Sequence, residues 1–157
     1  MTEPRTPIVA DDFVPPGGLK SVDFVLEPLG PQHNESDYAA WTSSITHIQG
    51  TPGFENHDWP VEGEMTLEDN LGDMHMHAKD FADRVGFTYT VLSPADGSVI
   101  GCVYLYPPKR DGYDVDVRSW VRADHAPLDK PLHDAVLAWI GADWPFRTPD
   151  YAARDAN

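Results

Sequence analysis

Apolar side chains recur along this chain at two spacings, one typical of helices and one typical of strands. Spacings of three and four place side chains on one face of a helix, and they predict helices over about 33–49, over 66–85 and around 132–140. Thr66 is the predicted N-cap of the second helix. The apolar stripes are Tyr38, Trp41, Ile45 and Ile48; then Leu67, Leu71, Met74, Ala78, Phe81 and Val85; and then Leu132, Val136, Trp139 and Ile140.

Segments rich in β-branched and aromatic residues predict strands at 22–27, at 86–93 and 98–107 as a hairpin, at 113–122, and as a short last strand within 144–151. Alternation in 113–122 places Val115, Val117 and Val121 on one face, and Asp116, Arg118, Trp120 and Arg122 on the other. The order of elements predicts an α+β fold, in which helices flank a mostly antiparallel central sheet.

The ends of the chain differ from its middle in composition. Residues 1–20 are rich in Pro, Gly and charge and predict a loose N-terminal arm, from which Ile8, Val9, Phe13 and Val14 are candidates to dock. Residues 21–157 are expected to form a single domain. We find no signal peptide and no apolar run long enough for a membrane span, so we expect a cytoplasmic protein. The single cysteine, Cys102, lies in an apolar run and is expected to be a buried packing residue.

The chain is strongly acidic, and its charge is unevenly distributed. It has 26 acidic and 11 basic residues, a formal net charge of −15. Nucleic acids and anionic membrane surfaces need a basic footprint, so both are excluded as partners. Residues 109–130 hold five basic and five acidic residues and are neutral overall. An anionic ligand would be tolerated best around this segment.

A loop of about 123–131 joins the strand that ends in Val121 and Arg122 to the last helix. Backbone N–H groups at such a junction bind phosphate in many folds. This loop has no glycine, however, and Pro127 and Pro131 lack N–H groups. Asp129 is a predicted N-cap that would compete with a phosphate, whereas Lys130 would partly offset the repulsion. The residues alone leave open a structural connection and a divergent phosphate site.

In order, these segments resemble the GNAT N-acetyltransferase superfamily. Residues 24–41 (FVLEPLGPQHNESDYAAW) resemble the opening strand and helix of small GNAT-like proteins, and 86–107 resemble the second and third strands with their DG-x-x-I/V-G turn. The WVR sequence at 120–122 lies where the fourth strand leads into the acetyl-CoA loop. The resemblance covers roughly 23–147, and it implies a GNAT-like fold that is shortened at its C-terminal end.

The resemblance implies an N-acyltransferase that transfers an acetyl or similar acyl group from acyl-CoA to an unknown amine, on a small molecule or a protein. The superfamily's loop pattern, Q/R-x-x-G-x-G/A, falls on 126–131, where neither glycine position holds glycine. Acetyl-CoA is therefore expected to bind weakly. The strand is expected to splay from its neighbour at Val121 and Arg122. The candidate coenzyme-binding residues are Trp120, Val121, Arg122, Leu128, Asp129 and Lys130.

In the superfamily, a carboxylate near the start of the fourth strand often acts as base for the amine, and Asp116 and Asp114 are the nearest matches. An acid for the leaving thiolate would come from Tyr104, from Tyr106 or Tyr151, or from a second chain in a homodimer. Two other readings remain open. One is a catalytically inactive GNAT-fold binding or interaction module, and the other is a small α+β ligand-binding cone with an enclosed apolar cavity.

The histidines predict no metal site. On a helix His75 and His77 lie roughly 200° apart and cannot chelate one ion together. Asp73 and His77 are four residues apart, but two ligands do not make a site. His33 and Asp37, also four apart, are expected to form a surface pair.

Overall fold

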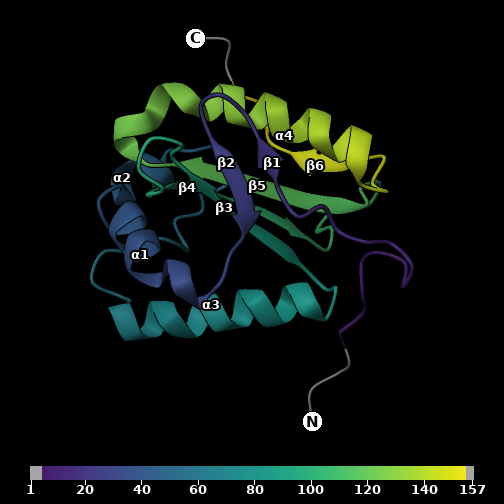
Figure 1. Cartoon of the computed structure of the whole chain (residues 1–157), viewed down its shortest axis with the longest axis horizontal. Coiled ribbons are helices and arrows are strands. Elements are labelled where there is room, and N and C mark those ends of the chain that lie inside the picture. The colour runs from purple at the N-terminus through teal and green to yellow at the C-terminus, as the bar shows by residue number, and fades with distance from the viewer. Residues whose placement is uncertain (1–4, 155–157) are drawn as a thin grey trace.

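The computed structural model describes residues 5–154, which form one open six-stranded sheet with helices on both faces (Figure 1). The strands lie side by side in chain order, and neighbouring strands are antiparallel except for the last pair, which is parallel. They are β1 (Leu19–Lys20), β2 (Val25–Pro28), β3 (Phe87–Leu92), β4 (Val99–Tyr106), β5 (Val115–Val121) and β6 (Pro149–Tyr151). The predicted α+β fold is confirmed. Because the sheet is open, the alternative of a closed cone is wrong.

Two layers of helices cover the sheet, α1 and α3 on one face and α4 on the other (Figure 1). The helices are η1 (Pro31–His33), α1 (Asn34–Thr42), α2 (Ile45–Gln49), α3 (Leu67–Ala82), η2 (Ala123–Leu128) and α4 (Asp129–Asp143). The alternation predicted for β5 is confirmed, since Val115, Val117 and Val121 pack in the core cluster under α4, while Trp120 packs in the cluster under α1. None of the helices in the described range combines the length and apolar character that a membrane span requires.

The single helix predicted over 33–49 is broken at two serines. Ser43 donates its hydroxyl to the carbonyl of Ala40, and Ser44 has a non-helical backbone conformation. Serine side chains compete with the helical backbone for hydrogen bonds. The Ser44 hydroxyl also accepts a hydrogen bond from the N–H of Ala123 at 2.8 Å. The break therefore ties the helical layer to the loop before α4.

The stripe predicted for α3 is partly wrong. Leu67 and Leu71 are exposed, whereas Asn70 and Met74 are buried. The start of α3 packs on polar groups of α1, and Asn70 supplies the hydrogen bonds that a leucine there would lack. The predicted N-cap of this helix, Thr66, is confirmed.

Part of the N-terminal arm packs against the sheet. Val9 is buried, and Ile8 and Phe13 lie against the same core cluster, whereas Val14 is exposed. The expected docking is therefore confirmed for three of the four residues. Cys102 is completely buried, as expected of a packing residue.

Candidate functional site

The second half of β5 has a free edge. β6 pairs with Val115–Val117 through Pro149–Tyr151. Within residues 5–154, no strand pairs with Ser119–Val121 on this side. β5 is thus not paired along its whole length on both sides, whereas its splay from its neighbour stays a prediction, because β6 ends at Tyr151. We call the region beside this free edge, between the end of β6 and the start of α4, the slot; side chains fill it in this conformation.

The guanidinium of Arg154 lies in the slot. Its Nη2 donates to the carbonyl of Ser119 at 2.8 Å, and its Nε donates to Oδ2 of Asp129 at 2.7 Å. A third bond runs from Nη1 to the carbonyl of Ala152 at 2.8 Å. Beside it, the hydroxyls of Ser119 and Tyr151 lie 2.5 Å apart. The side chain of Arg154 is 3% exposed, so it is part of the packed structure.

The loop before α4 is the short helix η2, and several of its backbone donors are already used or missing. The N–H of Ala123 binds the Ser44 hydroxyl, and that of His125 donates to the carbonyl of Arg122 at 2.8 Å. Pro127 has no N–H group. The loop therefore presents few free donors to an anion.

Asp129 is not the N-cap of α4, so that prediction is wrong. Leu128 holds the N-cap position without any side-chain bond, and Asp129 is the first residue of the helix. A charge-assisted bond to a buried guanidinium is stronger than a bond to a neutral N–H, and the carboxylate turns to Arg154. Lys130 pairs with Asp134 at 2.7 Å on the exposed side of the helix.

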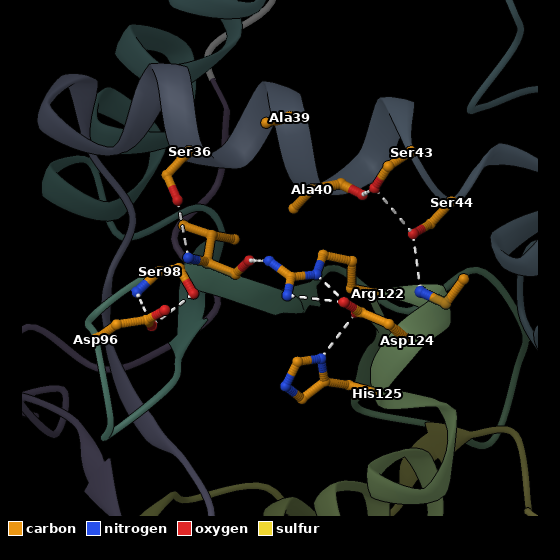
Figure 2. A network of polar contacts seen from close by, with 12 residues as sticks. Ser36, Ala39, Ala40, Ser43, Ser44, Asp96, Ser98, Arg122, Asp124 and His125 are labelled. Carbon is orange, nitrogen blue, oxygen red and sulfur yellow. Dashed lines mark hydrogen bonds and ion pairs between the residues drawn. The ribbon is translucent and has the colours of Figure 1, made fainter.

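A second ion pair holds the end of β5, as Figure 2 shows. Arg122 donates from Nε and Nη2 to the carboxylate of Asp124, at 2.7 and 3.0 Å. Its Nη1 reaches the carbonyl of Val99 at 3.3 Å, and the His125 ring lies 2.8 Å from Asp124. The guanidinium of Arg122 holds the pKa of Asp124 well below its usual range. The charge of Arg122 is thus already matched inside the protein.

The opposite side of β5 lines a cavity of about 400 Å³ between the sheet and helices α1 and α3. Four aromatic rings line it, and its polar wall carries four carboxylates and two basic side chains. The aromatic rings are Phe54, Trp59, Tyr104 and Tyr106, the carboxylates are Asp37, Asp73, Asp80 and Asp116, and the basic side chains are Lys109 and Arg118.

Asp37 is a buried carboxylate of this cavity, only 4% exposed. Its Oδ2 accepts a hydrogen bond from the Asn70 amide at 3.1 Å, and the Asn70 carbonyl accepts one from the Trp41 indole at 2.9 Å. Burial raises the pKa of Asp37 to about 6, and the bond from Asn70 offsets part of that rise. In the range 5–154, Asp37 has no ion-pair partner.

The other carboxylates of the cavity differ in how their charge is balanced. Asp80 pairs with Arg5 and accepts the Tyr106 hydroxyl at 2.7 Å. Burial raises the pKa of Asp73, and no basic side chain within 5–154 forms an ion pair with it. Among the described residues, Asp37 and Asp73 therefore have no ion-pair partner, and Lys109 in the same wall offsets one of the two charges, so the ionised cavity keeps one negative charge in excess.

Two of the three predicted catalytic residues line this cavity. Asp116 forms an ion pair with Arg118, with Nε and Oδ2 3.2 Å apart. The hydroxyl of Tyr104 accepts a hydrogen bond from the Trp120 indole at 2.9 Å, and burial raises the pKa of this tyrosine well above its usual value. Asp116 and Tyr104 come from neighbouring strands and lie in the same wall.

The third predicted catalytic residue, Asp114, lies elsewhere. Its two carboxylate oxygens accept the backbone N–H groups of Arg147 and Thr148, at 2.7 and 3.1 Å. These bonds fix the turn that leads into β6, and Asp114 is not among the residues that line the cavity.

The six predicted coenzyme residues are not gathered around one cavity. Trp120 and Val121 are completely buried on opposite faces of β5, and Leu128 packs partly buried against the core. Arg122 and Lys130 are held in ion pairs with nearby aspartates. Among the six, Asp129 contacts the residue that fills the slot.

Of the two histidines on α3, His77 makes structural contacts and His75 is exposed. Nδ1 of His77 lies 3.1 Å from the hydroxyls of Tyr106 and Thr88. No group of three potential metal ligands occurs among the residues that the structure describes.

The surface pair expected of His33 and Asp37 is wrong, because both residues are buried. His33 instead accepts the Gly30 N–H and lies 2.7 Å from Glu27.

Sequence reasoning missed Asn70, Trp59 and Arg154. The signal for Asn70 was its place four residues before Met74, on the inward face of α3. Trp59 lies in a segment without regular structure, where no periodicity reports which side chains turn inward. No pattern in the sequence pointed to Arg154, which follows the last strand.

No family model and no curated protein matches the chain. Solved structures of similar fold do match. One is the ribosomal-protein-S5-alanine acetyltransferase from Vibrio fischeri, with a TM-score of 0.61 and 9% identity, over 78% of this chain and 66% of that one. This chain therefore spans just under two thirds of its length.

Two further structures agree. A GNAT-family acetyltransferase from Bordetella pertussis has a TM-score of 0.55 and 18% identity, over 78% of this chain and 71% of that chain. The microcin C7 self-immunity acetyltransferase MccE, in complex with acetyl-CoA and AMP, has a TM-score of 0.59 and 13% identity, over 83% of this chain and 68% of that chain. The chain has the fold of the GNAT acetyltransferases.

Proposed function

We propose that the chain is an N-acyltransferase whose acceptor is a cationic amine bound in the acidic cavity. The observation that carries the proposal is the buried, unbalanced carboxylate of Asp37 in a cavity on β5, the strand whose other half has a free edge. The neighbours in fold are acetyltransferases, which supports this reaction class.

The cavity suits an ammonium group attached to an apolar body. Asp37 and Asp73, which have no ion-pair partner within 5–154, attract a cation, and a cation that displaces water there gains more than it would at the surface. The rings of Phe54, Trp59 and Tyr104 supply apolar contact and faces for cation–π interaction. The net charge of −15 adds long-range attraction for a cation.

The bound ammonium first loses one proton to a carboxylate of the cavity and becomes the free amine. An acyl-CoA would supply the acyl thioester, and transfer to that amine forms a C–N bond, breaks the C–S bond and moves a second proton from the nitrogen to the thiol. In this chain, Asp37 binds the ammonium. Asp116, whose carboxylate is positioned by Arg118, is our candidate for accepting the amine's proton. Tyr104 is a poor acid for a thiolate, whose own pKa is about 8.5, because burial raises the tyrosine's pKa. We assign it to the cavity wall.

The residues in the slot do not fit a coenzyme as they are placed. Coenzyme A is a long amide chain with phosphates, and Arg154 fills the free edge where such a chain would lie. The nearby guanidinium of Arg122 is already paired with Asp124. This observation favours a second candidate function, a GNAT-fold module that binds a cationic ligand without transferring an acyl group.

Calorimetry and a thiol-release assay separate the two functions. Tryptamine, an ammonium beside an aromatic ring, is the probe for the cavity, and acetyl-CoA is the donor. We expect Asp37→Asn to weaken tryptamine binding, and Asp116→Asn to lower kcat with little change in KM. Glu35→Gln is the matched control, since Glu35 is an exposed acid on the same helix as Asp37.

Binding of tryptamine without binding of acetyl-CoA would favour the module over the enzyme. Failure of tryptamine and of other cationic amines to bind would contradict both functions.

A further inference from the structure

We propose that Arg154 determines whether the slot admits a coenzyme, by occupying the free edge of β5 until it is displaced. The inference rests on the proposed function, because it concerns the site where the acyl donor would bind. Arg154 is a residue that controls access, and it takes no part in the transfer itself.

The first argument is the nature of the edge. A free strand edge presents backbone groups that an extended, amide-bearing ligand can pair with as an added strand. At Ser119 the carbonyl faces the slot, and Nη2 of Arg154 donates to it at 2.8 Å. The arginine thus supplies the donor that a ligand amide would supply, and the two cannot bind Ser119 in the same place.

The second argument is charge. Arg154 is buried with Asp129 as its ion-pair partner, at 2.7 Å, and the pair is neutral as a unit. Removing one partner of a buried ion pair leaves the other charge uncompensated, which is unfavourable. Displacing Arg154 leaves the Asp129 carboxylate near the phosphates of an arriving coenzyme. The pair therefore opposes coenzyme binding in two ways. Arg154 fills the slot while it is in place, and the Asp129 carboxylate repels the phosphates once Arg154 has left.

The third argument is the depth at which the Arg154 side chain is buried, compared with Arg110, another arginine that forms an ion pair. Arg110 makes two hydrogen bonds to the carboxylate of Asp150 on β6, at 2.9 and 2.6 Å, yet its side chain is 64% exposed. Arg154 makes bonds to two carbonyls and a carboxylate and is 3% exposed. The fold therefore encloses the Arg154 side chain, whereas it leaves the Arg110 side chain largely in solvent.

The experiment removes the arginine and its partner together. Arg154→Ala with Asp129→Asn empties the slot, leaves no unpaired carboxylate, and keeps the formal net charge at −15 because one charge of each sign is lost. The matched control is Arg110→Ala with Asp150→Asn, which removes an ion pair outside the slot and also keeps the net charge. Each protein is titrated with coenzyme A at low salt, after circular dichroism and a thermal melt have verified the fold.

We expect the slot variant to bind coenzyme A roughly tenfold tighter than the wild type, because a charge-assisted bond to Ser119 no longer has to be broken. The control should bind as the wild type does. If the slot variant does not fold, Asp129→Asn alone serves as the second variant. It should also bind more tightly, because Arg154 then has no competing carboxylate and can turn to the phosphates.

The outcomes distinguish this inference from the proposed function. Equal, measurable binding by all proteins would overturn the role of Arg154 and leave the acyltransferase standing. Binding by the slot variant alone would support the role of Arg154 and contradict acyl transfer by the wild type. No binding by any of them would overturn both, since an emptied slot would then not be a coenzyme site.

Discussion

Replacing Asp37 with Asn should stabilise the protein at neutral pH while it weakens amine binding. The carboxylate is 4% exposed, and burial raises its pKa from the ordinary 3.8 to about 6. At 1.36 kcal/mol for each pH unit, this difference corresponds to ~3 kcal/mol that the ionised carboxylate costs the folded state. Asparagine can still accept the hydrogen bond from Asn70 and carries no charge.

The sign of the pH dependence follows from the raised pKa. Below pH 3.8 the carboxyl is protonated in both the folded and the unfolded state, and it costs nothing. Between pH 3.8 and about 6 the unfolded state loses its proton first, so the wild type loses stability as pH rises. The gain in unfolding free energy of Asp37→Asn should therefore be absent below pH 3.8 and complete above about pH 6.

Urea unfolding of both proteins at a series of pH values measures this difference. In a thermal melt at pH 7, the same ~3 kcal/mol corresponds to a rise in Tm of roughly 6–12 °C for a domain of this size. Glu35→Gln, on the exposed side of α1, should instead lower stability by a few tenths of a kcal/mol, since Glu35 is an acid in the first turn. If Asp37→Asn is less stable than the wild type at pH 7, a cation balances this carboxylate in the folded state and the reasoning is wrong.

Three further predictions concern the rest of the molecule. Thr66→Ala should lower the free energy of unfolding by about 1 kcal/mol, because Thr66 and Asp69 cap α3 reciprocally; an unchanged urea midpoint would refute this. In a calorimetric titration, Zn²⁺ should show no saturable binding that requires both His75 and His77. A binding isotherm that disappears when either histidine is replaced would contradict the argument that the two lie on different sides of the helix. Cys102 should react with a thiol reagent only after unfolding in guanidinium chloride, because the thiol is completely buried and burial raises its pKa; rapid reaction of the native protein would refute this.

The fold could be predicted because its signals are local. The alternation in β5 and the stripe in α4 follow from burial on one face, and the predicted hairpin matches β3 and β4 closely. The errors occurred where polar side chains replaced apolar packing. Ser43 and Ser44 ended α1, and Asn70 took the inward position that the apolar pattern had assigned to leucines.

The site could be predicted only in part, because its contacts join residues that are far apart in the sequence. The position of Asp116 follows from alternation along one strand, and the cavity contains it. Asp37 was placed on the correct helix, but its burial depends on Asn70, which lies 33 residues later. The bond from Arg154 to Ser119 spans 35 residues, and no periodicity in the sequence carries that information.

The balance of charges on the two sides of β5 indicates which ligand this conformation accepts. In the slot, Arg154 and Asp129 neutralise each other, as do Arg122 and Asp124 at the end of the strand, so neither cation is free for a phosphate. In the cavity, Asp37 is buried without such a partner. A cation entering the cavity gains attraction and breaks no ion pair with Asp37, whereas an anion entering the slot must first separate a buried pair. The charges of this conformation therefore favour a cation in the cavity over an anion in the slot, and the proposed acyl transfer requires the displacement of Arg154.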